Sequence, residues 1–183
     1  MEKIDIIKSI SERTGGDIYL GVVGAVRTGK STFIKKFIEN LVVPNIEDEY
    51  ERKRCLDEIP QTAQGKTIMT IEPKFVPSTA AKIKVEEFET NIKLVDCVGY
   101  VIPAAKGYED EMGEPRMVKT PWYDEDIPFV EAAEIGTEKV IRDHSTIGIV
   151  VTTDGSIGDI TRNNYIEAEN EVISELKEIG KPF

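Results

Sequence analysis

The chain has 183 residues, of which 40% are hydrophobic and 7% aromatic, so it can form one globular domain with a sizeable core. Its formal net charge of -11 repels nucleic acid and anionic lipid surfaces, so a bound polyanion must be held by local groups. No apolar run approaches the roughly 18 residues of a membrane span, and the charged N-terminus is unlike a secretory signal. The two cysteines, Cys55 and Cys97, lack the spacing of a zinc site or a disulfide framework. We therefore expect a cytoplasmic protein with reduced thiols, no nucleic-acid partner and no direct insertion into a membrane.

The first part of the chain predicts a helix, a buried strand and a second helix. Isoleucines over residues 4–10 have helical spacing, residues 18–23 form a short apolar run, and apolar residues over 33–41 share one helical face. Residues 44–67 are polar and lack apolar periodicity, so we expect a long loop with one helical turn over 49–56. Loops of this length in compact domains are usually functional or mobile.

The middle of the chain predicts strands joined by short and long connections. Strands are expected over residues 70–76, 83–88 and 92–96, with a hairpin turn at 89–91. The following stretch, residues 99–128, is rich in proline and glycine and is expected to be irregular.

The last part returns to an alternation of helix and strand. A helix is predicted over 129–144, a strand over 147–151 and a helix over 165–179. Strands alternating with helices predict an α/β fold with a mainly parallel sheet and one antiparallel edge pair. A further strand is expected after residue 181, so we interpret residues 1–183 as one nucleotidase domain, truncated at its C-terminus, of a longer protein.

A phosphate-binding motif lies between the first predicted strand and the helix that follows it. Residues 24–31 fit the pattern G-x-x-x-x-G-K-[ST], whose glycines let successive backbone N–H groups face one centre at a helix N-terminus. Lys30 supplies a positive charge for the β and γ phosphates, and the Ser31 hydroxyl is a magnesium ligand. The residues predicted to hold the nucleotide here are Gly24, Ala25, Val26, Arg27, Thr28, Gly29, Lys30, Ser31 and Thr32. For Arg27, contact with the phosphates, contact with a neighbouring subunit and simple solvation all stay open.

A second motif, Asp96-Cys97-Val98-Gly99, follows the predicted strand over 92–96. A carboxylate at the carboxyl end of a strand points into the crevice where the ligand of an open α/β sheet binds. Asp96 is therefore predicted to hold magnesium directly or through water, and the Gly99 N–H to contact the γ-phosphate.

A threonine in the long loop between these motifs is expected to close on magnesium and the γ-phosphate, as in nucleotide switches. Thr70 is the best placed because it stands at the start of the strand predicted over 70–76, Thr67 is second, and Thr62 is a further candidate. The predicted catalytic residues are then Lys30, Thr70 and Asp96, and the predicted metal ligands are Ser31, Thr70 and Asp96.

The threonine and the D-x-x-G pattern favour the GTPase-like branch of P-loop proteins, a three-layer fold, over the kinase branch. The chain carries no base-reading N-K-x-D, and Tyr100 stands after Gly99 where Ras-type proteins carry glutamine, so water must be positioned differently. Three functions stay open on these residues: an ATPase that changes shape for self-assembly, a GTP-binding switch, and a scaffold that binds nucleotide without hydrolysing it.

At these residues the chain resembles the stage IV sporulation protein A family, the spore-coat morphogenetic ATPases. The resemblance spans the whole chain and is carried by strings longer than the phosphate-binding motif alone. These strings are residues 14–24, 24–31, 65–70, 94–100 and 132–137.

The resemblance implies ATP and Mg²⁺ as ligands, and hydrolysis that drives irreversible assembly into filaments around the developing forespore. It implies that Lys30 is the P-loop lysine, Thr70 the sensor threonine and Asp96 the magnesium-site aspartate. Some relatives carry a second threonine after the sensor, where this chain has Ile71, so a sensing role shared by two threonines is not expected. The implied partners are other copies of the protein, other spore-coat proteins and a small membrane-anchoring peptide, the last two through regions beyond this chain. The implied location is the mother-cell side of the forespore surface.

Overall fold

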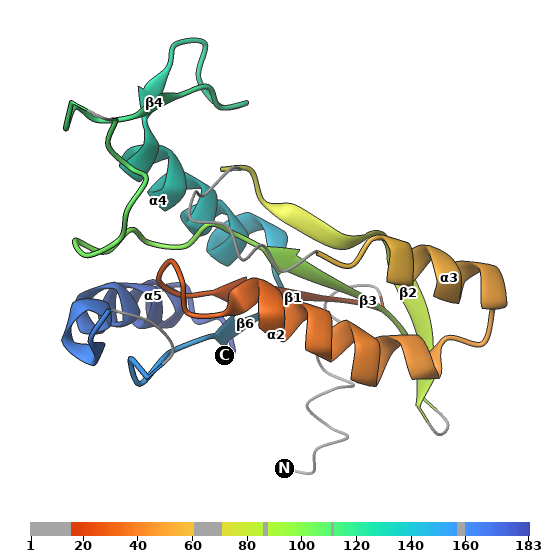
Figure 1. Ribbon diagram of the computed structural model, residues 1–183. Helices are drawn as coiled ribbons and strands as arrows, with labels where there is room; N and C mark the ends of the chain where they lie inside the picture. Colours follow the sequence, from red (N-terminus) through yellow and green to blue (C-terminus); the bar gives the residue numbers. More distant parts are fainter. Residues whose placement is uncertain (1–15, 61–70, 86–87, 111, 157–159) are drawn as a thin grey trace.

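The core of the fold is a four-stranded sheet with the order β2-β3-β1-β6 (Figure 1). The computed structural model describes residues 16–60, 71–85, 88–110, 112–156 and 160–183. Strand β1 (Asp17–Val23) lies parallel to β3 (Phe88–Asp96) and to β6 (Ile147–Val150), whereas β2 (Lys74–Val85) is antiparallel to β3. The predicted α/β class, with a mainly parallel sheet and an antiparallel edge, is therefore confirmed.

One face of the sheet is covered by the helices that follow β1. Helix α2 (Lys30–Phe37) continues as a π-helical turn, η1 (Ile38–Val42), and a short 3₁₀ turn, η2 (Val43–Asn45). Its apolar stripe, Ile34, Ile38 and Val42, is fully buried against alternate strand residues such as Val22 and Leu94. This packing explains why the predicted helix over 33–41 forms, since an amphipathic stripe at helical spacing must bury one face.

The opposite face is covered by helices from the second half of the chain, which gives the fold three layers (Figure 1). Helix α4 (Phe129–Lys139) continues into the π-helical turn η3 (Val140–His144), and η4 (Arg162–Tyr165) leads into α5 (Ile166–Glu178). The other alternate strand residues, such as Val23 and Val95, pack here with buried side chains of η3 and α5: Val140, Ile141, Val172 and Leu176. The helices predicted over 129–144 and 165–179 and the strand between them are thus confirmed.

Helix α3 (Glu49–Asp57) is longer than the single turn expected inside the loop over 44–67. The Asp48 side chain caps it by accepting a hydrogen bond from the Glu51 N–H at 2.7 Å, a cap of the type that stabilises a helix by about 1 kcal/mol. The helix also protects the edge of the sheet. Glu58 accepts from the Ser78 N–H at 2.5 Å and Glu51 from the Lys82 N–H at 3.2 Å, so exposed donors of edge strand β2 are occupied.

The strands predicted over 70–76 and 83–88 are wrong as separate elements, because β2 is one strand from Lys74 to Val85. The pairing with β3 shifts register between Val76 and Ala81. Pro77, which has no N–H to donate to the ladder, lies in that interval and explains the interruption. The predicted turn at 89–91 is also wrong, since these residues belong to β3 and Val85 already pairs with Phe88.

The stretch over 99–128, expected to be irregular, contains two short paired strands. Strand β4 (Met117–Val118) pairs antiparallel with β5 (Ile127–Pro128) and forms a separate small sheet beside the start of α4. In Figure 1 the segment labelled β4 lies beyond α4, away from the four-stranded sheet. The small sheet is too short for its strands to show alternation in the sequence.

Among the described residues, no helix combines the length and apolar character required to cross a bilayer. The helix predicted over 4–10 lies outside the described residues.

Strand β3 is one of the two interior strands of the sheet. We expect Leu94→Ala to lower the free energy of unfolding by about 2–5 kcal/mol, because the Leu94 side chain is fully buried and its truncation leaves a cavity. The matched control is Leu56→Ala on α3, whose side chain is 44% exposed and for which we expect a change within about 0.5 kcal/mol. Denaturant unfolding monitored by circular dichroism compares the two, and equal losses would contradict this account of the core.

Candidate nucleotide-binding site

The phosphate-binding motif forms a loop between β1 and α2. Strand β1 ends at Val23, and Gly29 is the N-cap of α2 with a φ of 91°, a left-handed conformation that glycine adopts without steric cost. Helix α2 then begins at Lys30, so the first free N–H groups of the helix lie at the end of the loop. This geometry suits an anion, because helix N-termini combine unpaired donors with positive potential.

The Lys30 side chain folds back over its own loop. It is only 5% exposed, and its Nζ donates to the Ala25 carbonyl at 2.6 Å and to the Gly24 carbonyl at 3.4 Å. The Thr28 hydroxyl donates to the same Ala25 carbonyl at 3.0 Å. These contacts hold the ammonium group at the centre of the loop, where the sequence predicted a charge for phosphate oxygens.

Ser31 and Asp96, far apart in the sequence, meet at the carboxyl edge of the sheet. The Ser31 hydroxyl donates to Asp96 Oδ2 at 2.7 Å. The parallel register explains the meeting, because Val22 lies opposite Asp96 and the chain enters the loop two residues later. The two predicted magnesium ligands are therefore brought together.

The polar atoms at this point suit a magnesium ion. Asp96 Oδ1 is buried and has no hydrogen-bond partner among the described residues. Magnesium in nucleotide sites is usually held by one or two protein oxygens, with phosphate and water oxygens completing the shell. The described residues contain no cluster of three or more His, Cys, Asp or Glu side chains of the kind that holds a metal by protein ligands alone. A hydroxyl and one carboxylate therefore fit an ion shared with a nucleotide.

Burial shifts the ionisable groups of the site towards their neutral forms. Burial lowers the pKa of Lys30, against the opposing fields of Cys97 and Asp96. Burial also raises the pKa of Asp96, against the Ser31 hydrogen bond and the Lys30 charge. Cys97, directly after Asp96, is buried and its pKa is raised to about 11, so it remains a thiol at neutral pH. A bound triphosphate and cation would restore charged partners to both Lys30 and Asp96.

Gly99 lies where the D-x-x-G segment touches the phosphate loop. Its φ is 90°, and a Cβ atom at this position would collide with the Gly24 carbonyl oxygen and with Lys30 Nζ. The contact continues at the next residue, where the Tyr100 carbonyl accepts from the Val26 N–H at 2.9 Å. The backbones of the phosphate loop and the D-x-x-G segment are therefore in direct contact.

Other predicted site residues differ in their placement. Arg27 is exposed with a φ of 62°, and its charge lies near the phenol of Tyr165, whose pKa is raised by burial against the field of Arg27. Thr32 is exposed on the first turn of α2. Thr62, Thr67 and Thr70 lie outside the described residues. Their neighbour Ile71 is described, and its carbonyl oxygen would lie 2.8 Å from a Cβ atom built on Gly136 of α4.

In the sequence, Tyr100 is only the residue that stands where Ras-type proteins carry glutamine. In the structure it is buried, 3% exposed, and joins the phosphate loop through its carbonyl and α5 through its hydroxyl. An aromatic residue after the D-x-x-G glycine hints at a packed position, but no sequence signal identifies its partner, Glu175.

Comparisons with known proteins identify what the chain is similar to. The family described as "Stage IV sporulation protein A, ATPase domain" matches residues 1–183. The chain is 70% identical over 184 residues to Stage IV sporulation protein A of Bacillus anthracis and, at the same identity, to that of Bacillus subtilis (strain 168). It is 58% identical over 180 residues, 98% of the chain, to the protein of that name from Clostridioides difficile (strain 630). The chain is covered completely by the two Bacillus alignments but spans only 37% of the length of those relatives, and 36% of the third.

The close contact of Gly99 with the phosphate loop can be tested by comparison with a second glycine of positive φ that lacks such a contact. Gly99→Ala is expected to weaken nucleotide binding at least about tenfold, or 1.4 kcal/mol, because the added methyl group must push the two motifs apart. Gly107→Ala is the control: its φ is 103°, but a Cβ atom there would meet nothing within 4 Å. Both variants are expected to lose about 1–2 kcal/mol of stability from the left-handed conformation. Titration with a fluorescent nucleotide compares their affinities, and similar affinities would contradict the proposed contact.

Proposed function

The chain belongs to the family of the ATPase domain of stage IV sporulation protein A, and we propose that it binds ATP with Mg²⁺ and hydrolyses it. The observation that carries the proposal is the contact between Ser31 and Asp96 at 2.7 Å beside the buried ammonium group of Lys30. P-loop proteins hold a triphosphate and its metal with the same groups: a lysine and a hydroxyl at the start of a helix, and a carboxylate at the end of a β-strand.

The proposed mechanism relies mainly on positioning and charge. Lys30 exchanges its hydrogen bonds to the Ala25 and Gly24 carbonyls for phosphate oxygens, and the N–H groups at the start of α2 face the same anion. Ser31 and Asp96 would hold Mg²⁺, which would neutralise the charge that develops on the phosphates. The Gly99 N–H would contact the γ-phosphate.

A threonine completes the site in this proposal. With nucleotide bound, Thr70 would contact the magnesium ion and the γ-phosphate. Its described neighbour Ile71 lies against Gly136 of α4. A movement of the threonine would therefore shift α4, because order–disorder transitions of switch segments displace the elements packed against them.

We propose that the energy of hydrolysis drives self-assembly into a basement layer of the spore coat, on the mother-cell side of the forespore. The support is the family, whose name places it in sporulation. The proposed partners are other copies of the protein, further coat proteins and a small membrane-anchoring peptide. The preference for ATP over GTP is supported by the family description.

Hydrolysis and the role of Lys30 are tested together. The full natural protein is expected to release phosphate from ATP in the presence of Mg²⁺ and to act poorly on GTP, at a rate that can be as slow as about 10⁻⁴ s⁻¹ without a partner. Lys30→Ala should weaken ATP binding about 10- to 100-fold, the value of a charge-assisted hydrogen bond of about 1.5–3 kcal/mol.

The control for Lys30 is Lys36→Ala on the same helix, an exposed lysine that contacts Glu39 at 2.9 Å. This variant should bind ATP like the wild type. A strong preference for GTP would refute the ATPase proposal, and unchanged ATP affinity of Lys30→Ala would refute the assignment of the phosphate loop.

The threonine assignment predicts a separation of binding from turnover. Thr70→Ala should keep its affinity for ATP but lose about 10²- to 10³-fold in turnover, the usual cost of removing a group that acts in the transition state. Thr67→Ala, three residues earlier, should turn over like the wild type. Single-turnover phosphate release measures both, and a loss confined to Thr67→Ala would move the role to that residue.

A further inference from the structure

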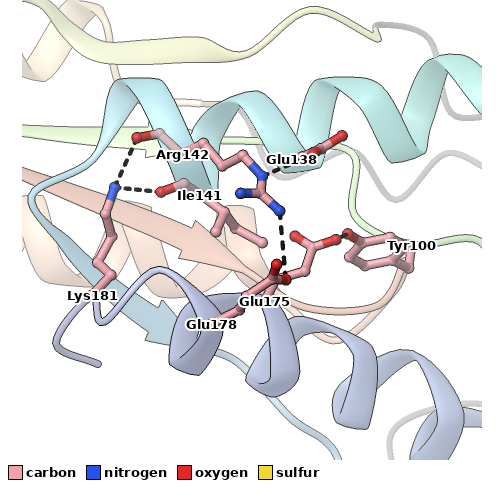
Figure 2. A network of polar contacts seen from close by, with 7 residues as sticks. All are labelled: Tyr100, Glu138, Ile141, Arg142, Glu175, Glu178 and Lys181. Carbon is pink, nitrogen blue, oxygen red and sulfur yellow. Dashed lines mark hydrogen bonds and ion pairs between the residues drawn. The ribbon is translucent and has the colours of Figure 1, made fainter.

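Tyr100 connects the phosphate loop to a helix on the far side of the sheet. Its backbone extends the pairing between β1 and β3, with a parallel bridge to Ala25 and a hydrogen bond from the Val26 N–H to its carbonyl at 2.9 Å. Its side chain points in the other direction, and its hydroxyl lies 2.5 Å from Glu175 Oε1 on α5 (Figure 2). One residue therefore joins the γ-phosphate end of the site to α5.

The hydroxyl must be the donor in this contact. Burial raises the pKa of Tyr100 far above its usual range, and the bond to Glu175 and the charges of Glu175, Glu171 and Glu138 act in the same direction. The phenol therefore keeps its proton at every physiological pH. Because this hydroxyl is engaged by Glu175, it is not directed at a water beside the phosphates, which is the task of the glutamine in Ras-type proteins.

Helix α5, which carries Glu175, makes ion pairs and hydrogen bonds with neighbouring elements near its C-terminal end. Arg142 of η3 lies between Glu138 of α4, at 2.8 Å, and Glu178 of α5, at 3.7 Å (Figure 2). Shortly after the end of α5 at Glu178, Lys181 donates to the carbonyls of Ile141 and Arg142 (Figure 2) and, at 2.5 Å, to that of Ser145. Glu175 is thus carried by a helix held at its C-terminal end, which makes it a fixed support.

We propose that Tyr100 is a positioning residue: its hydrogen bond to Glu175 holds the Gly99–Tyr100 backbone against the phosphate loop in the arrangement that γ-phosphate transfer requires. The inference rests on the proposed function. Gly99 has no side chain that could hold it, and the residue before it, Val98, is only partly buried. The bond at Tyr100 is therefore the nearest side-chain hydrogen bond after Gly99 that fixes this segment to another element among the described residues.

The test separates positioning from simple packing. Tyr100→Phe keeps the buried ring and removes only the hydroxyl, so we expect the kcat for ATP to fall about tenfold, the equivalent of about 1.4 kcal/mol. The affinity for ATP should stay within about twofold, because Lys30 and Ser31 remain in place. Glu175→Leu, which removes the acceptor, should reproduce this kcat. The double variant with Tyr100→Phe and Glu175→Leu should have the same kcat as either single variant, since the two residues act through one hydrogen bond.

Two further variants serve as rescue and control. Glu175→Gln keeps an oxygen acceptor for the phenol, so its kcat should lie close to that of the wild type. Tyr19→Phe also deletes a tyrosine hydroxyl that bonds a carboxylate, Asp17 Oδ2 at 3.1 Å, but at the amino end of β1, away from the site. It should leave kcat unchanged.

All variants are compared in the full natural protein, with thermal unfolding recorded beside steady-state ATP hydrolysis and equilibrium ATP binding. A wild-type kcat in Tyr100→Phe would overturn the inference. A loss of kcat that is matched by equal losses of ATP affinity and of folded protein would also overturn it, because packing alone would then explain the effect. A wild-type protein without turnover would instead refute the proposed function and the inference with it.

Discussion

The parallel pairing of β1 with β3 is the constraint on which the site depends. It sets Val22 opposite Asp96, so the two strands end side by side. Strand β1 leads into the phosphate loop and β3 into the D-x-x-G segment. The pairing resumes between Ala25 and Tyr100 beyond the sheet edge. Ligands of open α/β sheets bind at this carboxyl edge because both loops are presented there by buried, rigid strands.

The electrostatics of the site oppose those of the whole molecule. The chain carries a formal charge of -11, yet the loop presents a buried lysine, a helix N-terminus and glycine backbone to the ligand. Burial makes the local charges costly to hold alone, since it moves the pKa of Lys30 down and that of Asp96 up. A bound triphosphate with a cation would relieve both costs at once, so these groups suit an anion despite the negative field of the whole molecule.

Sequence patterns succeeded where the signal is local or strongly periodic. The strand before the loop, helices α2, α4 and α5, and the meeting of Ser31 with Asp96 all follow from hydrophobic period and motif context. The errors lie in the antiparallel edge. Two strands are predicted over 70–76 and 83–88, but cross-strand pairing with β3 makes residues 74–85 one strand, with a register shift between Val76 and Ala81. The helical turn predicted over 49–56 is confirmed in position, but α3 is longer than one turn, and its capping signal, Asp48 followed by Glu51, is present in the sequence.

By itself, the sequence determined the fold class, the phosphate loop and the identity of its charged groups, because these rest on residues close together in the chain. Only the tertiary structure decided which distant residues support the loop through polar contacts. The contact between Tyr100 and Glu175 joins residues 75 positions apart, and that between Lys181 and the carbonyl of Ile141 joins residues 40 apart. No local pattern predicts such pairs, since their partners are chosen by how the helices pack on the sheet and by the need of buried polar groups for hydrogen bonds.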